Sequence, residues 1–170
     1  LFDVVIDKNE PVTIIGGEAY LREDWLDITR RVRERGMLCT MTTGGRGLTR
    51  EKVKAAKEAG LQAISVSVDG LRASHDELRA VQGSYDSALS ALKYVDEIGG
   101  MRSSTNTQIN RLNLREIPAL FDVLLDHGIK AWQVQITTAM GRGGDQQEML
   151  LEPYQMLEVL PMLARLKRVG

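Results

Sequence analysis

The stretch Ala63-Ile64-Ser65-Val66-Ser67-Val68-Asp69-Gly70 decides the fold. Apolar and hydroxyl side chains alternate along it, which is the period of a β-strand that packs one face against other elements. Asp69 and Gly70 end the run, and an Asp-Gly pair is typical of a turn. If the strand belongs to a barrel, the face that carries Ser65, Ser67 and Asp69 is the interior.

Four other short apolar runs have the character of strands, and longer segments of helical period separate them. Strands are expected at residues 12–15, 38–42, 63–68, 102–106 and 131–136. They begin about 25 to 40 residues apart, which is typical of repeated βα units with a parallel sheet. Helices are expected at residues 24–35, 50–59, 85–98, 113–127 and 153–167.

Polar residues at the starts of these helices have the pattern of caps. The expected N-caps are Asp24, Thr49 and Ser84, and the segment that begins at Asn113 has the spacing of a capping box. In the last helix, Pro161 is expected to introduce a kink because it cannot donate a backbone hydrogen bond. The side chains expected to face inward on that helix are Leu157, Leu160 and Ala164.

The composition is that of one ordinary globular domain, with 170 residues of which 43% are hydrophobic and 26% are charged. Twenty-two Lys and Arg residues balance 23 Asp and Glu residues, so the net charge of -1 gives no basic excess for nucleic acid or an acidic membrane. The one cysteine, Cys39, excludes a disulfide framework and an iron–sulfur cluster held wholly by this chain. A cytoplasmic protein is expected.

Polar residues gather where the expected strands end, which is the edge at which parallel α/β proteins bind ligands. Gly16 and Gly17 let the backbone turn sharply and approach a ligand, and Glu18 could accept hydrogen bonds from an ammonium group. A glycine turn with a solvated carboxylate is the plainer alternative. Likewise, the polar side chains of residues 65–69 form either a pocket for a ribose or zwitterion or a polar strand end.

A helical turn after this strand places His75 and Arg79 four residues apart, on one face. Arg79 could hold a carboxylate through two donors, whereas His75 is interpreted as a polar residue at a helix start rather than a metal ligand. The amides on the last two strands, Asn106, Gln108, Gln133 and Gln135, must bond either a ligand or one another. Residues 140–143 form either a backbone contact to a planar base or a flexible loop.

In their order along the chain, these motifs resemble radical S-adenosylmethionine (SAM) enzymes. The resemblance is to the peptide-modifying maturases that carry a C-terminal SPASM or twitch extension, and it runs from about residue 12 to residue 142. The matching motifs are Gly16-Gly17-Glu18 with Tyr20-Leu21, Thr42-Thr43-Gly44-Gly45, the strand from Ser65 to Gly70, His75 to Arg79, Gly83-Ser84-Tyr85, Asn106 with Asn110 and Asn113, and Gly141-Arg142.

The resemblance implies an α/β fold, a partial (β/α)6 TIM-like barrel of parallel strands with the first βα unit missing. Residues 1–170 would form one partial core domain, strands two to six plus the following helix. The implied cofactors are SAM and a [4Fe-4S] cluster, which together give a 5′-deoxyadenosyl radical that abstracts hydrogen from a peptide or small-molecule substrate. The implied SAM-binding residues are Gly16, Gly17 and Glu18 for the ammonium group, Ser67 and Asp69 for the ribose or carboxylate, Arg79 for the carboxylate, Asn106 for the ribose, Gly141 beside the adenine, and Thr43 as a further contact to the cofactor.

The family's three-cysteine motif belongs upstream of Gly16, where this chain has no cysteine, so the ligands of the cluster are not expected here. Residues 1–9 are expected to be a helix tail, and Cys39 a buried thiol. The chain alone is therefore expected to be inactive and to hold no cluster. Two other functions stay open, a non-catalytic nucleoside-binding or scaffold domain and an acid–base TIM-barrel enzyme that uses Glu18 and Asp69. An unpaired strand edge near Val12 is expected to favour dimers.

Overall fold

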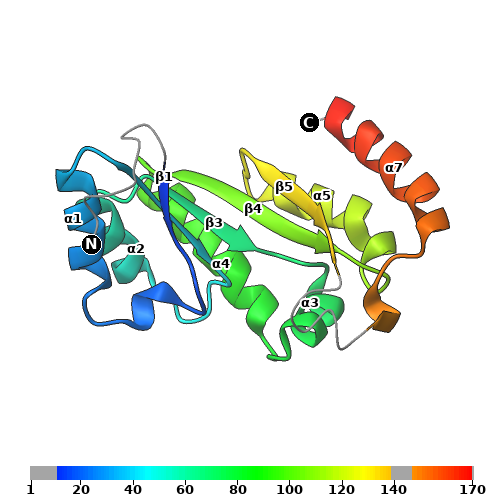
Figure 1. Ribbon diagram of the computed structural model, residues 1–170, viewed down its shortest axis with the longest axis horizontal. Coiled ribbons are helices and arrows are strands. Elements are labelled where there is room, and N and C mark those ends of the chain that lie inside the picture. Colours follow the sequence, from blue (N-terminus) through cyan, green and yellow to red (C-terminus); the bar gives the residue numbers. More distant parts are fainter. Residues whose placement is uncertain (1–10, 139–146, 170) are drawn as a thin grey trace.

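The computed structural model describes residues 11–138 and 147–169, and its centre is one parallel sheet (Figure 1). The strands are β1 (Pro11–Ile14), β2 (Leu38–Thr43), β3 (Ala63–Ser67), β4 (Arg102–Ile109) and β5 (Trp132–Ile136). They lie side by side in the order of the sequence, and all four neighbouring pairs are parallel. The predicted α/β class and the five predicted strands are confirmed.

Helices cover one face of this sheet, and Figure 1 shows α2, α4 and α5 behind the strands. The α-helices are α1 (Trp25–Glu34), α2 (Arg50–Glu58), α3 (Arg72–Arg79), α4 (Ser84–Ile98), α5 (Ile117–Asp126) and α7 (Met156–Val169). Short 3-10 turns are η1 (Ala19–Leu21), η2 (Leu114–Glu116), η3 (Gln147–Met149) and η4 (Pro153–Gln155). None of the helices in the described part of the chain is long and apolar enough to cross a membrane.

The two faces of the sheet differ in polarity, as the alternation at residues 63–70 predicts. Cys39, Met41, Ile64 and Val66 point toward the helices and are buried in the main core. The opposite face carries small hydroxyl and amide side chains that are partly exposed. Cys39 is 0% exposed, so the predicted buried cysteine is confirmed, and this burial raises the pKa of its thiol.

The predicted inner face of the last helix is wrong. In α7, Leu157 is 81% exposed and Leu160 is 58% exposed, whereas Val159 is completely buried in a second core cluster with Ile109 and Ile117. Both stripes have helical spacing, so only the partner elements decide which one packs. The side chains that turn inward with Val159 are Met162, Leu163 and Leu166. The helix continues through Pro161.

The predicted N-cap residues of the first two helices stand at the N-cap positions, but only one of them makes a capping hydrogen bond. Thr49 accepts a hydrogen bond from the Lys52 amide at 3.3 Å, as expected of an N-cap. Asp24 stands at the N-cap of α1 but makes no capping bond, because its carboxylate pairs with Arg22 at 2.7 Å.

The cap of α4 comes from another helix. Gly83 is the N-cap residue, one position before the predicted Ser84, and it has a positive φ of 79°. The carboxylate of Asp76, on α3, accepts hydrogen bonds from the Gly83 amide at 2.7 Å and the Tyr85 amide at 2.8 Å. Asp76 therefore joins α3 to α4, which fixes the segment that follows β3.

Candidate functional site

The loop after β1 has an open backbone. Gly16 and Gly17 are exposed and have positive φ angles of 103° and 43°, where a side chain would be strained although no atom stands in its way. Neither glycine amide hydrogen-bonds to any residue in the ranges that the structure describes. Nothing in the described part of the chain therefore competes with a ligand for these two amides.

Glu18, next along this loop, has a carboxylate that three neighbours hold. Its Oε2 atom accepts hydrogen bonds from the Tyr20 hydroxyl at 2.7 Å and from the Thr43 hydroxyl, while Oε1 accepts from the Arg46 amide at 3.2 Å. Burial raises the pKa of Tyr20, so its hydroxyl stays protonated and remains a donor. A Cβ atom added to Gly44 would lie 3.1 Å from Oε1. Glu18 is therefore an oriented carboxylate rather than a solvated turn residue.

The end of β3 carries a partly buried ion pair. The Asp69 side chain is 8% exposed, and its Oδ2 atom lies 2.5 Å from Nη2 of Arg79, on α3. The other oxygen, Oδ1, accepts a hydrogen bond from the Gln108 amide at 2.9 Å. The Nε atom of Arg79 is buried and has no hydrogen-bond partner among the described residues. The guanidinium therefore keeps donors for a further anionic group.

The backbone of Asp69 is also held on both sides. Its amide donates to Nδ1 of His75 at 2.9 Å, and its carbonyl accepts a hydrogen bond from Nδ2 of Asn113. The same Asn113 amide group donates to the Gln108 carbonyl at 2.7 Å, and its Oδ1 accepts from the Asn110 amide at 2.8 Å. Asn113 is completely buried and stands at the N-cap of η2, but its side chain makes no capping bond.

The inner face of β3 and β4 supplies further polar groups. Ser67 and Asn106 are register partners on these neighbouring strands. Ser65, on the same face, has a buried hydroxyl without a hydrogen-bond partner among the described residues. Farther along, Gln108 donates to Gln135 at 2.5 Å, so these two amides bond each other.

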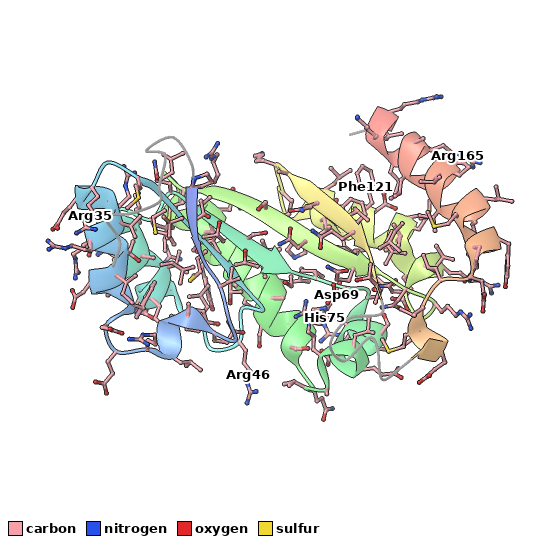
Figure 2. The ribbon with its side chains drawn as sticks, in the orientation of Figure 1. Arg35, Arg46, Asp69, His75, Phe121 and Arg165 are labelled. Atoms are coloured by element: carbon pink, nitrogen blue, oxygen red, sulfur yellow. The ribbon has the colours of Figure 1, made fainter. Side chains whose placement is uncertain are left out.

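The predicted site residues thus lie along one edge of the sheet. Glu18 contacts Thr43, Asp69 contacts Arg79, and Figure 2 shows Asp69 beside His75 where β3 ends. The sequence interpretation took His75 for a polar residue at a helix start, whereas its side chain is 1% exposed. It took Asn113 for the start of a capped helix, whereas the Asn113 amide group donates to the Asp69 and Gln108 carbonyls. Gly141, the rest of residues 140–143 and the expected helix tail at residues 1–9 lie outside the described residues.

The side chains present do not fit a [4Fe-4S] cluster. Cys39, the one cysteine, is fully buried on the face of the sheet that packs against the helices. Within residues 11–138 and 147–169, no group of three or more His, Cys, Asp or Glu side chains could hold a metal ion. No step of a reaction is therefore assigned to such a cluster on these residues.

A comparison of the sequence with known protein families identifies the family of this chain. The sequence profile of the Radical SAM superfamily matches residues 3–124, which is most of the chain. The chain belongs to the radical SAM superfamily. That membership implies SAM and a [4Fe-4S] cluster as the cofactors of the family.

Several curated proteins are similar to this radical SAM chain. It is 36% identical over 130 residues to an Fe-coproporphyrin III synthase of Methanosarcina barkeri, covering 76% of this chain and 32% of that protein. It is 28% identical over 162 residues to an AdoMet-dependent heme synthase of Nitratidesulfovibrio vulgaris, covering 94% and 44%. A PqqA peptide cyclase of Methylorubrum populi is 29% identical over 131 residues, covering 76% and 34%. The chain spans less than half the length of each of these relatives.

Solved structures agree on the fold. The coproporphyrinogen III oxidase HemN of Escherichia coli matches with a TM-score of 0.73 at 14% identity, covering 91% of this chain and 39% of that one. SuiB of Streptococcus suis matches with a TM-score of 0.71 at 19% identity, covering 94% and 35%. These likenesses concern the fold alone. They confirm the predicted partial TIM-like barrel of the radical SAM enzymes.

Proposed function

We propose that residues 1–170 form the SAM-binding part of a radical SAM enzyme of the SPASM type. The observation that carries this proposal is the pair of unlike loops at one sheet edge. An open glycine backbone adjoins the fixed Glu18 carboxylate, and Arg79 keeps free donors beside Asp69. The methionyl end of SAM presents an ammonium and a carboxylate, which are the groups that these two loops suit.

Each part of SAM has a group in the chain that suits it. The backbone of Gly16 and Gly17 and the oriented Glu18 carboxylate would take the ammonium group, and Arg79 would take the carboxylate. The hydroxyl and amide side chains on the inner face would contact the ribose, and the segment around residue 141 would lie beside the adenine. The groups that we assign to the carboxylate and ribose are Arg79, Thr43, Ser67, Asp69 and Asn106. The chemistry that the family's [4Fe-4S] cluster would supply, reductive cleavage of SAM to a 5′-deoxyadenosyl radical, is not assigned to any of these residues.

For the substrate we propose a tetrapyrrole. Support comes from similar proteins named for Fe-coproporphyrin III, heme and pre-heme d1 synthesis, of which the first is 36% identical. A peptide is the second candidate, because PqqA peptide cyclases are 28% to 29% identical and the fold resembles that of SuiB bound to a precursor peptide. Adding an iron coproporphyrin or a peptide to the SAM-bound protein separates the two. A shift of the porphyrin absorption band supports the tetrapyrrole, and saturable binding of the peptide alone contradicts it.

Titration calorimetry with two ligands tests the SAM site. SAM carries the methionyl group, whereas 5′-methylthioadenosine has the adenosine part without ammonium or carboxylate. The variant Arg79→Gln keeps an amide donor for Asp69 but removes the positive charge. We expect it to weaken SAM binding roughly tenfold or more and to change 5′-methylthioadenosine binding by less than about twofold.

Arg102→Gln is the matched control, because Arg102 is exposed at the opposite end of β4. This control should leave both affinities unchanged. Wild-type protein that binds neither compound would contradict the proposed function. Equal losses for both compounds in Arg79→Gln would instead show that Arg79 does not bind the carboxylate.

A further inference from the structure

His75 occupies an unusual position for a residue near a helix start. It lies on α3, is 1% exposed, and its ring packs edge-on against Tyr85 with 6.0 Å between the ring centroids. Its Nδ1 atom accepts the hydrogen bond from the Asp69 amide, so the ring proton must sit on Nε2 and the imidazole is neutral. Figure 2 shows the two residues next to each other below the end of β3.

The hydrogen bond from the Asp69 amide to His75 holds the backbone of Asp69, whose side chain binds Gln108 and Arg79. Holding the Asp69 amide fixes the direction in which its carboxylate leaves the backbone. That carboxylate in turn accepts from the Gln108 amide and pairs with Arg79. Arg79 lies four residues after His75 on the same helix, so the two side chains share one face of α3. His75 therefore holds Asp69 by its backbone amide, and Arg79 holds it by its carboxylate.

The surroundings favour the neutral ring that the hydrogen bond from the Asp69 amide needs. Burial lowers the pKa of His75, and the adjacent Arg79 lowers it further, against the opposing effect of Asp69 and Asp76. A protonated ring would present an N–H at Nδ1 to the Asp69 N–H. The hydrogen bond would then be lost.

We propose that His75 is a positioning residue that, through its Nδ1 atom and the Asp69 backbone, holds the Asp69–Arg79 pair in place to receive the carboxylate of SAM. The inference rests on the proposed SAM site. It assigns His75 no contact with SAM itself and no role as a metal ligand. What matters is one acceptor atom at the Nδ1 position, which an asparagine oxygen can replace and a glutamine cannot, because the glutamine amide lies near Nε2 instead.

The pair His75→Asn and His75→Gln tests this. We expect His75→Asn to bind SAM within about threefold of wild type and His75→Gln to bind it roughly tenfold more weakly, with 5′-methylthioadenosine binding unchanged in both. Thermal unfolding of each variant shows whether it is folded at the titration temperature. His127→Asn and His127→Gln, at the end of α5, are the matched controls and should behave alike.

A second measurement does not depend on SAM. The ¹⁵N chemical shifts of His75 should show the Nε2–H form, and exchange of the Asp69 amide hydrogen should be protected in wild type and His75→Asn but faster in His75→Gln. Equal exchange and equal SAM affinity in the two variants would overturn the role of His75. Wild-type protein with a protected Asp69 amide that binds no SAM would overturn the proposed function while leaving the hydrogen bond from Asp69 to His75 intact.

Discussion

The loops that follow β1 and β3 lie at the same edge of the sheet and are built in opposite ways. After β1, the backbone of Gly16 and Gly17 is open and one side chain, Glu18, is fixed by its neighbours. After β3, the backbone of Asp69 is bonded on both sides, and the donor that has no partner among the described residues belongs to a side chain, at Nε of Arg79. A zwitterionic ligand can therefore contact backbone groups of the loop after β1 with its ammonium end and the Arg79 side chain with its carboxylate end.

The largest effect on this comparison is expected from Asn113→Ala. It removes the donor to the Asp69 and Gln108 carbonyls and the acceptor for the Asn110 amide. The bonds to Asp69 and Asn110 are buried, and the bond to Gln108 is partly buried. Leaving buried polar groups without partners costs about 1–3 kcal/mol for each group, so we expect a loss of roughly 3 kcal/mol or more in the free energy of unfolding. Urea unfolding measures it.

Gln133→Ala is the control for Asn113→Ala, because Gln133 is an exposed amide on β5. This change should stay within about 0.5 kcal/mol of wild type. If the two variants lost similar free energy, the loop after β3 would not depend on its buried hydrogen bonds, and its contrast with the loop after β1 would disappear.

Two glycine substitutions, one in each loop, are expected to have effects of intermediate size on stability. A Cβ atom on Gly70 would lie 2.5 Å from Oγ of Ser74 and 2.9 Å from Oε2 of Glu116, so Gly70→Ala should cost about 1–3 kcal/mol of stability. A Cβ atom on Gly17 meets nothing within 4 Å, and only its positive φ of 43° is unfavourable. Gly17→Ala should therefore cost only about 1 kcal/mol.

SAM binding should rank these two glycine variants differently from stability. We expect Gly17→Ala to weaken SAM binding by more than its small loss of stability suggests, because it changes a backbone that we propose to contact the ligand. Thermal unfolding and calorimetry on the same samples give both rankings. A Gly17→Ala protein with unchanged SAM affinity would remove the loop after β1 from the site.

The sequence predicted the parts of this molecule that depend on neighbours along the chain. The short apolar runs predicted the five strands, and the segments of helical period that end at glycines predicted the helices between them. The predictions from sequence were wrong where residues far along the chain determine the packing or the length of an element. The face of α7 depends on Ile109 and Ile117, and β4 extends to Ile109, beyond the predicted end at residue 106, where the Gln108 amide donates to Asp69.

In the candidate site, too, features set by neighbours along the chain were predicted and features set by distant partners were not. The pattern of Gly16, Gly17 and Glu18 marked a turn that could approach a ligand, and the i, i+4 spacing placed Arg79 on the helix after β3. Nothing local indicated that His75 is buried, because that depends on α4 packing over it through Tyr85. The motif from His75 to Arg79 marked this segment, but nothing in it indicated that the partner of His75 is the Asp69 backbone amide.

The smallest expected effect is a dependence of stability on mildly acidic pH. Because burial holds the pKa of His75 below its ordinary value of 6.5, the unfolded chain binds a proton at this residue at a higher pH than the folded protein does. The contribution of His75 is therefore fully present above about pH 6.5 and is lost as the pH falls below that value. The loss should not exceed about 1.4 kcal/mol for each pH unit.

Comparing wild type with His75→Asn between pH 7 and pH 5 isolates this contribution. The charged groups around the ring are Asp69, Asp76 and Arg79, with Tyr85 packed on it from α4, and all four are present in both proteins. The free energy of unfolding should fall faster for wild type than for His75→Asn as the pH is lowered. Parallel curves would show that His75 takes up its proton in the folded protein as readily as in the unfolded chain, and its ring would then not be held as a neutral acceptor for Asp69.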